Sequence, residues 1–259
     1  MTANVLPPDQ GPAAAPPPPS VLTDEGLRAK EPDRIAGMFD AIAPRYDLLN
    51  RVLSAGFDQR WRARALRELA LIESDVLVDV CTGTADVALA ASRLPRAPKR
   101  VIGLDFSSEM LRRGLRKLRR ARETGILLLQ ADATRLPLRD HSADAATIAF
   151  GIRNVQHPDL ACRELARVIR PGGRIAILEF GLPRSPSFRR LYLWYAERVL
   201  PRIGALVSKH RSAYAYLPES VGRFPPPEQF GQLLQDSGFP HVAVVPLTLG
   251  IVYLYVARK

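Results

Sequence analysis

Cysteine is scarce in this sequence, and no part of it stays apolar for long. Only two cysteines, Cys81 and Cys162, occur among 259 residues. That number is too small for a disulfide framework, so a reducing compartment is expected. No hydrophobic run approaches the roughly 20 residues that span a bilayer. The start, MTANVLPPDQ, lacks the charged and then apolar pattern of a secretory signal. We therefore expect a cytoplasmic protein.

Histidine is also rare, and its spacing does not indicate a metal site. Zinc sites need ligands at short, regular intervals, which this chain does not offer. No Ser-His-Asp triad can be argued from the order of residues alone. We therefore expect no metal. The four histidines stand at positions 141, 157, 210 and 241.

Glycine is missing where most nucleotide-binding loops need it. The stretch VLVDVCTGTADVALA (76–90) is a buried strand that passes through one glycine, Gly83, into a helix. It contains neither the G-x-G-x-x-G fingerprint of dinucleotide sites nor the Gly-Lys-Ser/Thr of a P-loop, which argues against a dehydrogenase. A ligand with a nucleoside and an amino acid but no phosphates needs less glycine. S-adenosylmethionine is such a ligand.

Basic residues outnumber acidic ones, and they are unevenly spread. The net charge is +11, from 37 Lys or Arg and 26 Asp or Glu. Residues 93–122 hold eleven basic residues against two acids, and residues 184–211 hold seven against one. Such clusters attract nucleic acid or anionic lipid, or they form solvated helix faces. Charge alone does not decide among these interpretations of the basic clusters.

Short apolar runs alternate with helical patterns through most of the chain. This alternation predicts an α/β fold, with a parallel sheet covered by helices on both faces. Two closing runs without a helix between them predict an antiparallel edge. The expected strands cover 76–80, 101–104, 126–130, 145–150, 174–180, 242–246 and 251–257, and the expected helices cover 86–94, 107–122, 158–169 and 227–237. The motif RPGG is expected to end the helix over 158–169, and Gly238 to cap the helix over 227–237.

The regions before and inside this alternation suggest a domain plan. Residues 1–28 are rich in proline and are expected to be a disordered tail. One folded domain is expected over 29–259. Residues 29–72 are expected to form a helical cap, with helical spacing over 35–49, a break or kink at Pro44 and a further helix over 58–71. Residues 182–222 are expected to form a helical lid.

Acidic or polar side chains follow three successive strands. In an open α/β sheet, ligands bind at the carboxyl ends of the strands. Asp105 ends the second strand, where its carboxylate can accept both ribose hydroxyls or can cap the next helix. Asp132 follows the third strand and can either position an adenine amino group or shape a turn. Asp79 is expected to support the first turn, and Thr84 stands near a helix start whose N–H groups suit a carboxylate.

The sequence resembles the menaquinone/ubiquinone-biosynthesis C-methyltransferases, within the class I methyltransferase superfamily. FGIRNV and APRYD are the most specific motifs, whereas the strand-end acids and RPGG are common to many methyltransferases. The resemblance runs from about residue 34 to the C-terminus. The matching segments are MFDAIAPRYDLLNRVLSAGFDQRWR (38–62), VDVCTGTAD (78–86), GLDFSSEML (103–111), ADATRLPL (131–138), TIAFGIRNV (147–155), ELARVIRPGGRIAILEF (164–180) and SAYAYLPESVGRFP (212–225).

The resemblance implies the class I fold, an open sheet of about seven strands, and an S-adenosylmethionine site. Cys81 and Ala85 stand where the superfamily loop has its outer glycines, and the GTAD sequence favours menaquinone over ubiquinone. The acceptor implied is demethylmenaquinol, a hydroquinone with a polyprenyl tail. The implied cofactor residues are Thr84, Asp105, Asp132, Ala133 and Ala149, and we count Asp79 and Gly83 with them.

Catalysis at a ring carbon requires a phenol that is losing its proton. Arg153 and Asn154 follow the fourth strand and are expected to orient the hydroquinone oxygen. Their alternative roles are an ion pair with a surface acid and a chain turn. Tyr46 and Tyr214 are expected to line the acceptor pocket, unless they are ordinary core aromatics. His157 and His210 lie in polar stretches, where a solvated side chain is expected rather than a base.

A further helix over 188–207 combines apolar and aromatic residues with arginines. It can roof a pocket and contact an anionic membrane at the inner face of the cell, or it can pack on the core. Self-association into a homodimer stays open. No nucleic acid partner is expected, because no RNA-binding module and no Asn-Pro-Pro-aromatic motif is present. The alternatives are benzoquinol methylation in ubiquinone biosynthesis, methylation of nucleic acid or another small molecule, and a non-catalytic S-adenosylmethionine-binding subunit.

Overall fold

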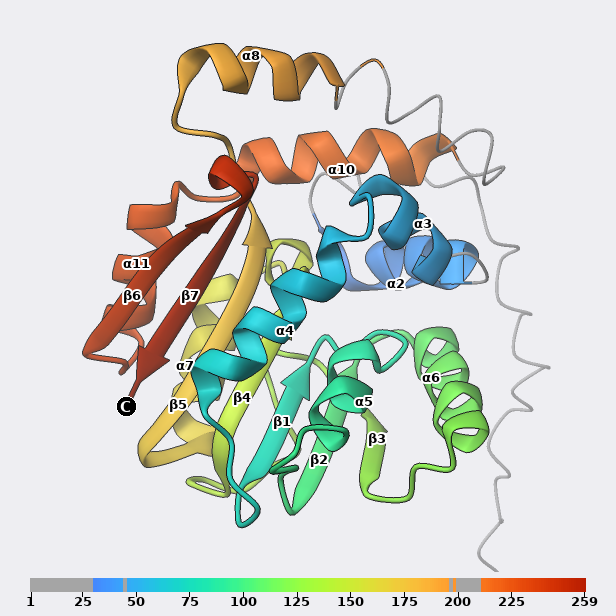
Figure 1. Ribbon diagram of the computed structural model, residues 1–259, viewed down its shortest axis with the longest axis vertical. Coiled ribbons are helices and arrows are strands. Elements are labelled where there is room, and N and C mark those ends of the chain that lie inside the picture. Colours follow the sequence, from blue (N-terminus) through green and yellow to red (C-terminus); the bar gives the residue numbers. More distant parts are fainter. Residues whose placement is uncertain (1–29, 44–45, 196–197, 199–210) are drawn as a thin grey trace, which may run out of the picture.

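Five parallel strands form the centre of the fold, because most of their residues are apolar on both faces. In the computed structural model, which describes residues 30–43, 46–195, 198 and 211–259 (Figure 1), the seven-stranded sheet has the order β3-β2-β1-β4-β5-β7-β6. β1, β2, β3, β4 and β5 run parallel, and β7 runs antiparallel to both of its neighbours. The predicted fold class, including the antiparallel edge, is confirmed.

The helices and strands follow the predicted alternation closely. β1 and β3 have the predicted bounds, and most other elements differ from them by one or two residues at an end. The strands are β1 (Val76–Val80), β2 (Arg100–Asp105), β3 (Ile126–Gln130), β4 (Ala143–Ala149), β5 (Ile169–Phe180), β6 (His241–Leu247) and β7 (Val252–Arg258). The helices are α2 (Pro32–Ile42), α3 (Tyr46–Leu53), α4 (Phe57–Leu69), α5 (Asp86–Ser92), α6 (Ser108–Ala121), η2 (Ile152–Asn154), α7 (Pro158–Val168), α8 (Pro186–Trp194), α10 (Arg211–Arg223), α11 (Pro227–Asp236) and η4 (Thr248–Gly250).

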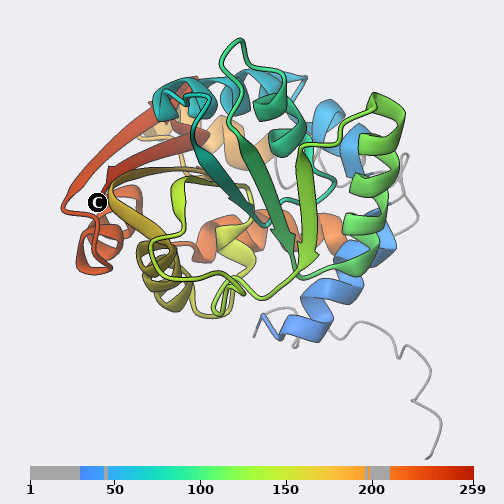
Figure 2. The same cartoon turned by 90° about the horizontal axis from the view of Figure 1, so that it is seen from below.

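Each face of the sheet buries its own hydrophobic cluster. On one face, residues of α7 and α11 pack on the strands, with Phe230 between Phe224 and Tyr255 at ring distances of 4.8 Å. On the other face, α4 and α5 cover the sheet, and Leu69 is fully buried there. Figures 1 and 2 show these helices on opposite sides of the strands. Burial on both sides explains why the central strands are continuous apolar runs.

The RPGG motif is where the structure corrects the sequence interpretation. α7 ends at Val168, and the motif lies inside β5, which begins at Ile169. Ile169 pairs with Ala143 and Arg174 pairs with Ala145, so β5 uses five residues where β4 uses two. A Cβ at Gly173 would lie 2.5 Å from Ile169 Cγ2 and 2.9 Å from the Asp144 carbonyl oxygen. The glycine therefore allows a bulge in the strand.

Helices gather over the carboxyl ends of the parallel strands. α2, α3 and α10 lie there in Figure 1, above β1 and β4. The predicted helical cap thus contains α2, α3 and α4, and Pro44 lies outside the described residues between α2 and α3. Asp40 of α2 accepts a hydrogen bond from Ser107 Oγ at 2.5 Å, next to the start of α6. This contact fixes α2 above the second strand.

The predicted lid is described only in part. α8 covers 186–194 of the helix expected over 188–207, and residues 196–197 and 199–210 lie outside the described residues, as does the proline-rich tail. α10 follows at Arg211. Among the described residues, no helix is long and apolar enough to cross a membrane.

Candidate active site

The loop after β1 is held by a buried carboxylate. Asp79 accepts hydrogen bonds from the hydroxyls of Thr82 and Thr147, both at 2.6 Å, and is 1% exposed. Burial raises its pKa to about 6. Gly83 has a φ of +56°, a left-handed conformation that a glycine adopts without strain. Asp79 thus supports the turn, as predicted from the sequence.

Asp105 joins this loop to the second strand. Its carboxylate accepts the Gly83 N–H at 2.7 Å and the Ser107 N–H at 2.9 Å. The helix after it is capped by Ser107, whose Oγ accepts the Met110 N–H. Asp105 is therefore not the cap of α6, which was its alternative role. Burial raises its pKa to about 6, despite the hydrogen bonds from Ser107 and Gly83.

The loop after β3 forms another wall of the site. Asp132 Oδ1 accepts the N–H and the hydroxyl of Thr134, both at 2.8 Å, so it shapes the turn. Ala133 is buried beside it, and both residues line the same cavity as Asp105. The turn role weighed for Asp132 is therefore observed, and its contact with an adenine amino group stays a prediction.

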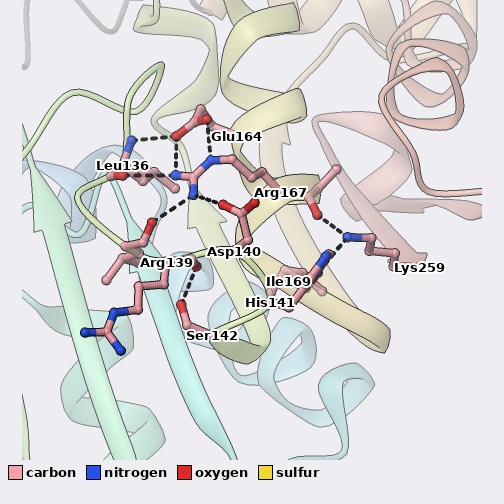
Figure 3. A network of polar contacts seen from close by, with 11 residues as sticks. Leu136, Arg139, Asp140, His141, Ser142, Glu164, Arg167, Ile169 and Lys259 are labelled. Carbon is pink, nitrogen blue, oxygen red and sulfur yellow. Dashed lines mark hydrogen bonds and ion pairs between the residues drawn. The ribbon is translucent and has the colours of Figure 1, made fainter.

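A charged anchor on α7 holds the far end of that loop (Figure 3). Arg167 donates to both carboxylate oxygens of Glu164 at 2.8 Å, to the carbonyl oxygens of Leu136 and Leu138 at 3.1 and 2.8 Å, and to Asp140 at 2.7 Å. Glu164 in turn accepts the Leu136 N–H at 2.8 Å. The planar guanidinium uses all three nitrogens. The fixed loop begins three residues after Ala133.

These strand ends enclose a first cavity of about 150 Å³. We call it the cofactor cavity. Asp105, Asp132 and Ala133 line it, and Gly83 and Ala149 line it as well. Its other walls come from the cap, from the segment after β4, and from β1 and the segments that follow β1, β2 and β3. They are Lys30, Ile35, Ala36, Phe39, Tyr46, Val80, Cys81, Phe106, Ser107, Ala131, Thr134, Phe150, Gly151, Asn154, Val155, Gln156 and His157.

Thr84 faces away from this cavity. Its hydroxyl donates to Asp47 at 2.5 Å and accepts from Lys117 Nζ at 2.9 Å. Lys117 also contacts Asp47 and Asp86. Thr84 and Asp79 instead line a smaller cavity behind the loop. The expected cofactor residues are therefore divided between two neighbouring cavities.

A second, larger cavity of about 340 Å³ adjoins the cofactor cavity. We call it the apolar cavity, because aromatic and aliphatic side chains make most of its wall. Phe39, Tyr46 and Phe150 border both cavities. The remaining walls are Met38, Ile42, Asn50, Ser54, Ala55, Phe57, Asp58, Trp61, Arg62, Arg153, Phe180, Tyr192, Tyr195, Tyr216, Thr248 and Ile251.

Arg153 lies on the wall of the apolar cavity and pairs with a buried acid. Its Nη1 donates to Glu179 Oε1 at 2.8 Å and to the Phe150 carbonyl oxygen at 2.5 Å, and its Nε donates to Ser220. Glu179 is 0% exposed and also accepts the Arg153 N–H. Burial, the largest single cause, would lower the Arg153 pKa, but the charge and hydrogen bond of Glu179, together with Tyr46 and Tyr216, raise this pKa. A surface ion pair, the alternative weighed for Arg153, is wrong.

Asn154 lines the cofactor cavity and has an unused acceptor. Its Oδ1 is buried and has no hydrogen-bond partner among the described residues. Buried polar atoms are almost always satisfied, so such an orphan calls for a ligand. The Asn154 Nδ2 contact to the Phe150 carbonyl oxygen is long, at 3.5 Å. Asn154 and Arg153 thus face different cavities across one turn of η2.

Of the remaining residues considered for the site, the structure describes the side chains of Tyr46 and His157 but not those of Tyr214 and His210. Tyr46 lines both cavities, and burial raises its pKa. Tyr214 lies in α10, but its side chain is outside the described residues, as is His210. Tyr216 lines the apolar cavity instead. His157 is exposed at the rim of the cofactor cavity, which fits the solvated side chain expected for it.

Several wall residues carry no signal that sequence reasoning could use. Glu179 looks like an ordinary strand residue until its partner, 26 positions earlier, is known. Trp61, Phe57 and Phe180 meet only through the fold, with Trp61 6.1 Å from Phe57 and 6.4 Å from Phe180. The part of the chain that is described contains no group of three His, Cys, Asp or Glu suited to a metal ion.

The fold is that of S-adenosylmethionine-dependent methyltransferases. It matches such an enzyme from Thermotoga maritima with a TM-score of 0.61 at 20% identity, covering 87% of this chain and 99% of that one. It also matches one from Aquifex aeolicus with a TM-score of 0.53 at 20% identity, covering 76% and 88% of the two chains. The [4+2]-cyclase SpnF has the same fold, with a TM-score of 0.59. Fold alone therefore does not define the reaction.

Sequence relatives define the family. The model of the ubiE/COQ5 methyltransferase family matches residues 27–259, and the chain belongs to this family. A ubiquinone/menaquinone biosynthesis C-methyltransferase from Syntrophotalea carbinolica is 52% identical over 84% of this chain and 91% of that protein. Demethylmenaquinone methyltransferases from Deinococcus radiodurans and Thermus thermophilus are 43% and 46% identical, over 94% and 86% of this chain and 97% and 100% of those proteins.

The family confirms what the motifs predicted about the activity. The protein is an S-adenosylmethionine-dependent C-methyltransferase of the ubiquinone/menaquinone biosynthesis type. The cofactor cavity fits this cofactor on two counts. A half-buried carboxylate, Asp105, stands at the end of β2, and Asn154, whose Oδ1 has no partner among the described residues, lines the cavity.

Cofactor affinity should fall as the pH drops through 6. The sulfonium cofactor carries positive charge, and the carboxyls of Asp79 and Asp105, whose pKa values are both about 6, are neutral at lower pH. For one proton, affinity falls by about tenfold between pH 7 and pH 5. Calorimetric titration with S-adenosylmethionine measures it. Asp105→Asn should remove most of the pH dependence, and exposed Asp140→Asn should keep it. A constant affinity over this range would contradict the prediction.

Proposed function

We propose that this enzyme methylates a ring carbon of demethylmenaquinol, giving menaquinol. The observation that carries the proposal is the shared wall of Phe39, Tyr46 and Phe150 between a cavity that contains strand-end carboxylates and a larger, more apolar one. The first cavity suits the cofactor, and the second suits a prenylated hydroquinone. The names of the Deinococcus radiodurans and Thermus thermophilus relatives support the naphthoquinol acceptor.

In this proposal the cofactor cavity holds the donor by its nucleoside. Asp105 accepts the ribose hydroxyls, because its carboxylate is fixed by two backbone N–H groups. Asp132 and Ala133 border the adenine, and Gly83 and Ala149 leave room for the sulfur end. When bound, the cofactor supplies an electrophilic methyl group on a sulfonium. The protein aligns that group with the acceptor across the shared wall, which lowers the barrier by several kcal/mol, on the order of the orientation effects known for enzymes.

Arg153 acts on the acceptor in this proposal, and Asn154 lies on the donor side. A ring carbon becomes nucleophilic as the neighbouring phenol loses its proton, so charge develops on that oxygen. Arg153 stabilises this charge from the apolar cavity, and Glu179 fixes its guanidinium through the contact at 2.8 Å. Asn154 completes the wall on the donor side with its unused Oδ1. Because Arg153 does not border the cofactor cavity, it affects the acceptor alone.

Replacing Arg153 should therefore separate catalysis from cofactor binding. We expect Arg153→Gln to lower turnover by roughly 10²- to 10³-fold, the loss typical of removing one stabilising donor. S-adenosylmethionine affinity should stay within about threefold, because the cofactor cavity is unchanged. Methyl transfer to a short-tailed demethylmenaquinol and calorimetry provide the two readings. Exposed Arg163→Gln, which breaks an ion pair with Asp159, is the matched control. Normal turnover in Arg153→Gln would refute the phenolate role.

Quinone profiling tests the acceptor class. Cells that lack the gene should accumulate a quinone one methyl group lighter than menaquinone, and a plasmid copy should restore the mature form. Mass spectrometry of the lipid extract gives the reading. Accumulation of a precursor of ubiquinone instead would support the benzoquinol alternative, and an unchanged quinone profile would contradict both.

We further propose that α8 contacts an anionic membrane and guides the prenyl tail. Tyr192 and Tyr195 at this helix line the apolar cavity, whereas Leu191 and Trp194 are 58% and 57% exposed. Arg189 and Arg190 on the same helix are exposed too. An apolar outer face with adjacent arginines suits the lipid headgroup boundary. One short helix therefore borders both the cavity and the proposed lipid surface.

Vesicle flotation checks this contact. The enzyme should float with vesicles that contain anionic lipid at moderate salt and should remain in the lower fraction with neutral vesicles. Leu191→Ser combined with Trp194→Ser should reduce flotation severalfold, because both exposed apolar side chains are lost. Exposed Leu160→Ser on α7 is the control. Absence of any association in the wild-type protein would remove the membrane proposal and leave the reaction untouched.

A further inference from the structure

A small third cavity lies behind the loop after β1. Its volume is about 20 Å³, roughly the space of one water molecule. Cys81, Gly83, Ala149 and Tyr46 border both this space and the cofactor cavity, so the two spaces are neighbours on either side of the loop. We call it the annex. Its other walls are Arg62, Asp79, Thr82, Thr84, Asp86 and Val87.

Arg62 of α4 supplies the cationic side chain in the annex wall. Its Nη1 has ion-pair partners, whereas its Nε–H has no acceptor among the described residues. Its Nη1 pairs with Asp58 at 2.5 Å and with Asp86 at 3.4 Å. Its Nε is buried and has no hydrogen-bond partner in the part of the chain that the structure describes. The residue is 8% exposed. A buried guanidinium N–H without an acceptor is costly unless a ligand supplies one.

The guanidinium is also fixed in position. Asp58 accepts a hydrogen bond from Ser54 Oγ at 2.9 Å, which holds the first ion pair. The Phe150 ring lies 5.8 Å from the Arg62 guanidinium carbon. Phe150 is part of the wall shared by the two large cavities. Arg62 is therefore held beside the point where donor and acceptor meet.

The chemistry of the donor indicates what the unpartnered Nε–H binds. S-adenosylmethionine ends in an amino acid, whose carboxylate carbon is four bonds from the sulfonium sulfur. With the ribose at Asp105, the methionine end runs past Gly83 toward the annex. Arginine is the side chain best suited to a carboxylate, because its N–H groups form a planar fork.

Three other candidates for the carboxylate are less suitable. The Thr84 hydroxyl is already used by Asp47 and Lys117. Helix α5 has only seven residues, too short to offer a strong N-terminal site. Lys117 Nζ is occupied by Asp47 and Asp86 at 2.7 and 2.5 Å.

We propose that Arg62 binds the methionine carboxylate of S-adenosylmethionine in the annex. The proposal rests on the placement of the nucleoside at Asp105. It assigns a binding role to a cap residue, since α4 belongs to the helical cap. The cap and the loop after β1 then hold the donor from opposite sides.

A double cycle of protein and ligand tests this pairing. The ligands are S-adenosylmethionine and decarboxylated S-adenosylmethionine, which differ only in the carboxylate. The proteins are the wild type and Arg62→Gln, with affinity measured by calorimetry. We expect the wild type to bind the decarboxylated ligand at least 20-fold more weakly, and Arg62→Gln to discriminate by less than threefold. Such coupling isolates the pairwise contact from any general effect on stability.

Matched variants keep the test decisive. Arg64→Gln changes an exposed arginine on the same helix, paired with Glu68, and should keep wild-type discrimination. Arg62→Lys retains the charge and should restore part of it. If Arg62→Gln does not fold, the ligand pair is compared between Arg62→Lys and the wild type, where a smaller ratio for the lysine variant is expected.

Two results would overturn the proposal. In the first, the wild type binds both ligands equally. In the second, Arg62→Gln, or Arg62→Lys where that comparison is used, discriminates as strongly as the wild type. A wrong placement of the nucleoside at Asp105 would give a different result. In that case Asp105→Asn, in an otherwise wild-type protein, would leave the affinity for both ligands unchanged.

Discussion

The carboxylate of Asp105 organises the donor side of the active site. It accepts hydrogen bonds from the N–H of Gly83, 22 residues earlier in the loop after β1, and from the N–H of Ser107, 2 residues later at the start of α6. One side chain therefore holds both segments. Placing a carboxylate in this partly buried position is unfavourable, which is why its pKa is raised to about 6. A carboxylate held this way is prepared to accept ligand hydroxyls without reorganising.

The acceptor side is built on a different principle. There the wall is mostly aromatic, and polarity is concentrated in the buried pair of Arg153 and Glu179. Such a pair gains little net stability, because both charges lose their hydration. The pair instead helps to fix the orientation of the Arg153 guanidinium, which donates to Glu179, Phe150 and Ser220 at the same time. The two cavities thus differ in polarity, as their ligands do.

The sequence predicted the sheet well and the contacts poorly, for physical reasons. Strand and helix periods are local, so β1 and β3 could be assigned from a few residues each. RPGG could not be interpreted correctly, because proline and glycine mark a turn and a strand bulge alike, and only the pairing of Ala143 and Ala145 separates them. Asp105 and Asp132 were identifiable from their positions at strand ends. The buried partner of Arg153 was not, because it depends on two strands lying side by side.

The shared wall has a consequence for the order of events in turnover. Phe39 and Tyr46, both from the helical cap, border both large cavities. Asp40 fastens α2 beside α6, and Asp47 fastens α3 to Lys117. Any movement of these helices that releases one ligand also loosens the enclosure of the other. In the proposed arrangement of the ligands, exchange of the spent donor and departure of the methylated lipid therefore depend on movement of the same helices. The two steps are coupled in each catalytic cycle.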